Sequence, residues 1–296
     1  MPQNDNIQKF STRQHMVNPK LEVYHYRDAY LNDVALHHHD FYEVYYFLNG
    51  NVNYIIEGRT YRLSPGDLLL ISPLELHQPL ILPEKHAYER IVLWMNKQFV
   101  EQFGSEGVSL TRCFDVSNPN HTNLLRLNSQ QRQRIGSLLK RMLDETRNDD
   151  YGRELVLTAL MTEFLVEVNR INANRDDQPE QESRSAPLVA EVLDYINEHY
   201  HEHLTLDNLA AHFFVSKYHL LHEFNRHVGT SVYRYIIQRR LIIARQMLAD
   251  GIAPTDVYHQ CGFGDYANFY RTFKAEYHMS PKDYMNHSRG KPVKAE

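Results

Sequence analysis

The chain has 296 residues, of which 42% are hydrophobic and 23% charged, as expected for a globular protein of about two domains. Its formal net charge of −5 argues against a non-specific coat on nucleic acid. No apolar run approaches the roughly 20 residues of a membrane-spanning helix, and the polar start MPQNDNIQKF has no signal-peptide core. Cys113 and Cys261 fall in different halves, which excludes a disulfide framework. We therefore expect a cytoplasmic protein without a membrane partner.

The first half contains short runs rich in Val, Ile, Tyr and Leu, which are typical of β-strands. These runs are YEVYYFL, NVNYIIE, DLLLIS and RIVLWM. Turn signals separate them at Asn49-Gly50, Glu57-Gly58, Ser64-Pro65-Gly66 and Leu82-Pro83-Glu84. Many short strands at near-regular spacing predict a barrel or a sandwich.

From Ser129 the hydrophobic period becomes helical. One face of a first helix carries Ile135, Leu138, Leu139, Met142 and Leu143, and a second helix is marked by Val156, Leu160, Phe164 and Val168. Both helices are expected to pack on the barrel. An alternative stays open, in which Ile135, Leu138, Leu139 and Met142 also form a dimerisation seam.

The segment 172–187, NANRDDQPEQESRSAP, is polar and closed by proline, as expected of a linker. It separates a domain at 1–171 from an all-helical domain at 188–287. The second domain contains the same unit twice, at 206–228 and 254–277. Each unit is a short helix, a turn and a second helix with two apolar residues four apart, Leu220 and Phe224 or Phe269 and Phe273. This pattern is typical of a helix-turn-helix, whose second helix can enter a DNA major groove.

The second helix of each unit has a mixed polar and aromatic outer face, which is suited to contact base edges. The candidate DNA-binding residues are Lys217, Tyr218, Leu221, His222, Asn225 and Arg226 in the first unit, and Tyr266, Ala267, Tyr270, Arg271 and Lys274 in the second. A connecting helix over about 231–249 would span about 28 Å, close to the roughly 34 Å between successive major grooves. Its Arg239 and Arg240 are expected to be solvated or ion-paired. Residues 188–296 hold 12 Lys+Arg and 12 Asp+Glu, so bulk electrostatic attraction to DNA is weak.

The last hundred residues resemble the DNA-binding domain of the AraC-type (AraC/XylS) transcriptional regulators. The matching pieces are LTLDNLAAHFFVSKYHLLHEF, RRLIIARQML, CGFGDYANFYRTFK and MSPKDY, with His278 standing where glycine is usual. The resemblance implies double-stranded DNA as a partner, a homodimer, and RNA polymerase as a further partner if the protein is an activator. It also implies that positions such as Tyr218, His222 and Arg271 face bases or phosphates.

The first half carries a histidine cluster, HHHDFYE at 37–43. His37 and His39 would point to one side of a strand together with Glu43, and a distant His77 could join them to hold a divalent metal. The spacing H-x-H-x3-E-x6-G resembles the first motif of the cupin β-barrel, which implies an effector-binding domain. The candidate effector-binding residues are His37, His39, Glu43, His77, Tyr45 and Trp94, and His37, His39, Glu43 and His77 are also the metal candidates. No cofactor is expected to be required.

The predicted fold class is α+β and multidomain: an N-terminal cupin-like β-barrel with C-terminal flanking helices, then an all-α domain with two helix-turn-helix units. The leading functional hypothesis is a DNA-binding transcriptional regulator, and not an enzyme, controlled by a small molecule such as a sugar or sugar derivative. The alternative is a metal-dependent cupin enzyme of the dioxygenase or isomerase type with an accessory helical domain. A regulator whose barrel only dimerises is a third hypothesis.

Overall fold

A computed structural model describes residues 16–29, 34–73, 75–82, 87–118, 121–147, 149–175 and 187–288. The chain divides into two compact units, Met1–Ser183 and Arg184–Glu296, which are described separately. The division falls inside the predicted linker 172–187, most of which lies outside the described residues, as does most of the predicted turn at Leu82-Pro83-Glu84. Among the described helices, none is long and apolar enough to cross a bilayer.

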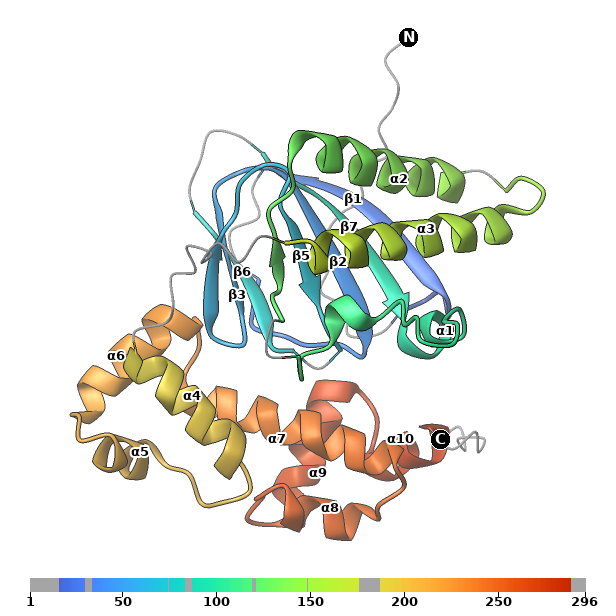
Figure 1. Ribbon diagram of the computed structural model, residues 1–296. Coiled ribbons are helices and arrows are strands. Elements are labelled where there is room, and N and C mark those ends of the chain that lie inside the picture. Colours follow the sequence, from blue (N-terminus) through green and yellow to red (C-terminus); the bar gives the residue numbers. More distant parts are fainter. Residues whose placement is uncertain are drawn as a thin grey trace. The chain divides into compact units, whose positions relative to one another are not determined.

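The N-terminal unit contains two antiparallel sheets (Figure 1), as the sequence predicted. One has the strand order β1-β7-β2-β5-β8 and the other the order β4-β3-β6. The strands are β1 (Leu21–Asp28), β2 (Phe41–Asn49), β3 (Val52–Ile56), β4 (Arg59–Arg62), β5 (Leu68–Ile71), β6 (His77–Ile81), β7 (Tyr88–Asn96) and β8 (Leu124–Leu125). The four apolar runs became β2, β3, β5 and β7. The other four strands had not been predicted.

Strand β2 is central because both of its faces are covered. Tyr42, Val44 and Tyr46 belong to one apolar cluster with α2 (Ser129–Arg147) and α3 (Arg153–Ala173), which lie across the five-stranded sheet in Figure 1. The alternate side chains, including Tyr45 and Phe47, belong to a second cluster with residues of β3 and β4. The odd-numbered side chains of β2 therefore point into the interior between the two sheets. The short helices α1 (Lys97–Glu101) and η1 (Arg112–Phe114) complete the unit.

The prediction that both helices pack on the barrel is confirmed, but the predicted dimerisation seam is not available. Ile135, Leu138, Leu139 and Met142 are all at most 4% exposed and pack into the cluster that joins α2 and α3 to the sheet. A helical period identifies a buried face but not the partner that buries it, and here the partner is the same chain. On α3 the predicted Leu160, Phe164 and Val168 are buried, whereas Val156 is 39% exposed and its neighbour Leu157 is buried instead.

The C-terminal unit is entirely helical in its described part, as predicted. Its helices are α4 (Pro187–His199), α5 (Leu206–His212), α6 (Lys217–Val228), α7 (Val232–Ala249), α8 (Pro254–Gln260), α9 (Tyr266–Tyr277) and α10 (Pro281–Ser288). Thr205 and Ser216 cap α5 and α6 by accepting hydrogen bonds from the backbone N–H groups of Asn208 and His219.

Arg240 on α7 is neither solvated nor ion-paired as expected. Its side chain is 9% exposed, and it donates hydrogen bonds to the carbonyl oxygens of Tyr200 (2.8 Å) and Glu202 (2.7 Å). Those carbonyls lie after the end of α4, where backbone acceptors have no helical partner. Arg240 therefore fixes the turn that leads from α4 into the first helix-turn-helix.

Candidate DNA interface and barrel site

The first helix-turn-helix consists of α5 and α6, and the second of α8 and α9. Leu220 and Phe224 on α6, and Phe269 and Phe273 on α9, are all fully buried, which confirms the predicted core faces. Capping of the two second helices is also alike: Ser216 and Asp265 accept hydrogen bonds from backbone N–H groups at the N-termini. The burial of one face fixes which side chains of α6 and α9 point outward.

The predicted DNA-facing side chains of α6 lie on its outer surface. Lys217, Tyr218, Leu221, His222, Asn225 and Arg226 are all exposed. The ring of Tyr218 is 79% exposed and parallel to that of His222, with 6.3 Å between their centroids. Lys217 forms an ion pair with Asp207 of α5. The exposed face thus presents flat rings flanked by a lysine and an arginine.

On α9, Tyr266, Ala267, Arg271 and Lys274 are exposed and Tyr270 is half-buried. The Arg271 Nε donates a hydrogen bond to the Ala267 carbonyl oxygen at 3.3 Å. The ammonium of Lys274 lies 6.0 Å from the centre of the Tyr270 ring. This face has the same chemistry as that of α6, with aromatic rings beside positive charges.

Helix α7 packs against α6 and α9, the second helices of the two units (below, the recognition helices), and holds them in one compact domain. Its Tyr235 packs edge-on against Phe224 of α6, with 5.8 Å between ring centroids. Leu241, Ala244 and Leu248 belong to the same apolar cluster as Phe269 and Phe273 of α9. The helix has 18 residues and so spans about 27 Å. One rigid helix therefore carries contacts for both units.

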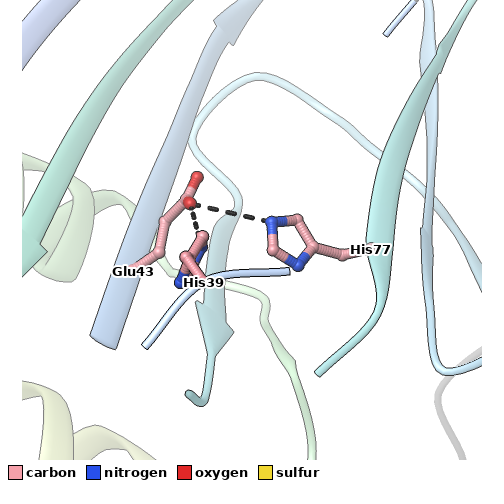
Figure 2. A group of neighbouring side chains, drawn as sticks. All are labelled: His39, Glu43 and His77. Atoms are coloured by element: carbon pink, nitrogen blue, oxygen red, sulfur yellow. Dashed lines mark hydrogen bonds and ion pairs between the residues drawn. The ribbon is translucent and has the colours of Figure 1, made fainter. Parts of the chain in front are cut away.

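Three of the predicted barrel residues meet between the sheets: His39, Glu43 and His77 (Figure 2). Glu43 lies on β2, His39 on the segment before it, and His77 begins β6. His39 Nε2 is 2.7 Å and His77 Nε2 is 3.8 Å from Glu43 Oε2. One donor atom from each of the three residues lies within 4.8 Å of the others. All three side chains are almost completely buried.

Burial determines the charge state that each group prefers. It raises the pKa of Glu43, although His77, His37 and the Trp94 indole act in the opposite direction. It lowers the pKa of His77 well below the usual value, and the neighbouring His37 and His39 add to this effect. Glu43 and His77 therefore both favour their neutral forms in this buried site.

The other predicted effector residues lie around these three side chains. His37 is only half-buried, and its ring centroid is 4.3 Å from that of His77. Trp94 packs on Phe41, whose ring is stacked on His39. The Tyr45 hydroxyl is hydrogen-bonded to that of Tyr88, whose pKa burial raises to about 12. The predicted residues are thus gathered in one region, with His37 at its partly exposed edge.

Sequence reasoning did not identify Arg90 as part of this interior. It is 1% exposed, pairs with Asp28, and lies 4.1 Å from the ring centre of Tyr88 and 4.9 Å from that of Tyr26. The sequence feature that could have identified Arg90 is its place at the start of the apolar run RIVLWM. A charged side chain on a strand that is buried on both faces needs a buried partner.

A separate cleft of about 510 Å³ lies between β1 and the facing ends of α2 and α3. Its rim carries charges of both signs, and Lys20 pairs across it with Glu154 of α3. None of the predicted site residues lines it.

Comparison with known proteins agrees with this division. Residues 19–165 match the family model of the AraC-like ligand binding domain, and residues 209–287 match that of a helix-turn-helix domain. The HTH-type transcriptional activator RhaS of Salmonella schwarzengrund (strain CVM19633) is 23% identical over 256 residues, covering 83% of this chain and 86% of the relative. RhaS of Escherichia coli O139:H28 (strain E24377A / ETEC) is 23% identical over 263 residues, covering 85% and 87%. The C-terminal domain of AraT from Geobacillus stearothermophilus is 24% identical, with a TM-score of 0.35, over 38% of this chain and 91% of that domain.

The two matched domains, in this order, define a DNA-binding protein with a ligand-binding domain. The chain belongs to the AraC-type (AraC/XylS) transcriptional regulators. It is accordingly a regulator and not an enzyme, which sets aside the alternative of a cupin dioxygenase or isomerase.

Proposed function

We propose that this chain regulates transcription by placing α6 and α9 in adjacent major grooves of one DNA site, under the control of a sugar or sugar derivative bound in the barrel. The observation that carries the DNA part is the pair of exposed, mixed faces held by the single helix α7. The length of α7, about 27 Å, is compatible with the roughly 34 Å spacing of successive grooves.

A sugar effector is supported by the chemistry of the barrel interior. Imidazole, carboxylate and phenol groups of His39, Glu43 and Tyr45 can form hydrogen bonds with sugar hydroxyls. The nearby ring of Trp94 offers an apolar surface for the C–H face of a sugar. To regulate, the effector must bind one DNA-binding arrangement more tightly than the other. We further propose that the protein acts as a homodimer and, if it is an activator as the relative RhaS is named, that it contacts RNA polymerase.

The DNA part is tested by selecting binding sites from random DNA with the full chain and comparing variants on the selected site. Tyr218→Ala combined with Arg271→Ala removes one large contact from each recognition helix. We expect a loss of about 2–6 kcal/mol in binding free energy, or about 1–3 per contact. Tyr151→Ala with Arg141→Ala is the matched control, because both residues are exposed on the N-terminal unit. Equal binding by the two double variants would contradict the assignment.

The effector part is tested by thermal shift of the full chain against a sugar panel, followed by DNA binding with each hit. A sugar that raises the melting temperature and also changes DNA affinity supports the proposal. If no sugar shifts the melting temperature while DNA binding is intact, the sugar-effector proposal is wrong.

A further inference from the structure

The three-residue cluster of His39, Glu43 and His77 has a hydrogen-bonding pattern that a metal-free sugar pocket does not require. His39 Nδ1 lies 2.9 Å from the Phe41 carbonyl oxygen, and His77 Nδ1 lies 2.8 Å from the Glu75 carbonyl oxygen. A carbonyl oxygen can only accept a hydrogen bond, so both Nδ1 atoms carry the hydrogen. In the neutral rings both Nε2 atoms then present lone pairs, and both lie beside the Glu43 carboxylate.

This arrangement places three electron-pair donors around one point. His77 Nε2 has no hydrogen-bond partner in the described part of the chain, although the residue is fully buried. His39 Nε2 is 2.7 Å from Glu43 Oε2, too close for two lone pairs without a positive charge between them. A single proton can bridge two of the three atoms, whereas a metal cation accepts all three.

The surroundings hold the two imidazoles as a metal site requires. Backbone carbonyls that accept from Nδ1 fix the tautomer and the ring orientation of histidine ligands. The Phe41 ring is stacked on His39 at a centroid distance of 3.9 Å and an interplanar angle of 5°. An ion at about 2.1 Å from each donor brings the donors to about 3.4 Å apart, between the shortest and the longest separations within this group.

We propose that the barrel binds one divalent first-row transition-metal ion through His39 Nε2, the Glu43 carboxylate and His77 Nε2. Two imidazoles and one carboxylate suit Zn²⁺, Fe²⁺, Mn²⁺ or Co²⁺ better than the all-oxygen preference of Mg²⁺ or Ca²⁺. Three protein ligands leave at least one coordination position open. If the proposed sugar effector is correct, its hydroxyl groups are suited to fill that position.

The test uses the full chain, purified without a histidine tag and stripped with EDTA. Titration with Co²⁺ should give a saturable visible absorption band at one equivalent, and Zn²⁺ should abolish it. Glu43→Gln and His77→Gln should each weaken Co²⁺ binding by at least about 100-fold, since loss of a second-shell partner alone costs 10–100-fold. His25→Gln is the matched control, because His25 lies 2.8 Å from Glu89 on neighbouring strands of the same sheet and is not part of the three-residue cluster.

If a ligand variant fails to fold, the wild-type protein still gives an answer by NMR. Co²⁺ should shift two imidazole N–H signals that exchange slowly with water, those of His39 and His77 Nδ1. A wild-type protein with no saturable Co²⁺ band, or Gln variants that bind as well as the His25 control, would overturn the proposal. Because metal binding is measured without DNA or sugar, a negative result here leaves the DNA and sugar tests unaffected.

Discussion

The turn of each helix-turn-helix contains one residue in the left-handed backbone region, and a different residue type occupies that position in each unit. The second unit uses Gly262, with φ +75°, and the first uses Phe214, with φ +53°. A Cβ added to Gly262 would lie 2.5 Å from the carbonyl oxygen of His201 and 2.8 Å from its carbonyl carbon. Both atoms are backbone, so the neighbouring loop would have to move. Gly262→Ala should therefore lower the free energy of unfolding by more than the strain of a left-handed backbone conformation alone.

The left-handed conformation costs roughly 1–2 kcal/mol for a residue with a Cβ, and the steric overlap brings our estimate to about 3 kcal/mol. Phe214→Gly should have the opposite sign, because the side chain is 96% exposed and its removal relieves strain without losing burial. We expect a gain of up to about 1 kcal/mol, since the greater freedom of glycine in the unfolded chain offsets part of the relief. Gly264→Ala is the control, with nothing within 4 Å of its Cβ.

Urea unfolding of the full chain measures these effects. Far-UV circular dichroism follows all helices, while the single tryptophan, Trp94, reports only the N-terminal unit. The C-terminal transition is therefore the part of the dichroism change without a matching fluorescence change. A loss below about 1 kcal/mol for Gly262→Ala, or a marked loss for Phe214→Gly, would refute the reasoning from turn geometry.

Three further changes test burial, packing and capping. Burial raises the pKa of the Glu75 carboxyl from 4.5 to about 7. As pH rises between these values the unfolded chain loses this proton before the folded chain does, so the free energy of unfolding falls by about 3 kcal/mol. Urea titrations from pH 4 to 8 should show that Glu75→Gln removes this dependence of stability on pH. Leu139→Ala should lower the unfolding free energy by about 2–5 kcal/mol without weakening self-association in sedimentation experiments, and a change in association alone would restore the dimer seam. Ser216→Ala should cost about 1 kcal/mol by dichroism-monitored unfolding, and no loss would show that the cap on His219 N–H is not needed.

The sequence predicted those elements whose burial produces a clear pattern of apolar residues along the chain. Strand β2 was predictable because a strand covered on both faces is a continuous apolar run. The strands β4 and β6 leave a weaker trace, because they form the two edges of their sheet. An edge strand such as β4, RTYR, tolerates polar residues, and β6 even contains Pro79.

The barrel site was only partly predictable for a related reason. The argument that placed His37 beside His39 assumed strand alternation, but both residues precede β2, so the parity rule does not apply to them. His77 joins the group through tertiary contact alone, 38 residues after His39 along the chain. Local pattern therefore indicated Glu43 and its neighbours, while the third donor of the cluster depended on sheet packing.

The charges on α6 and α9 bear on how the proposed DNA interface would distinguish one DNA site from another. Four of the predicted DNA-facing side chains are basic: Lys217, Arg226, Arg271 and Lys274. Lys217 is paired with Asp207, and Arg226 lies 3.9 Å from Glu223, so part of this positive charge is already balanced by the protein. Sequence-independent attraction to phosphates scales with the number of charges that remain available. If the proposed function is correct, we expect discrimination to come mainly from contacts of exposed rings such as Tyr218 with base edges and thymine methyl groups.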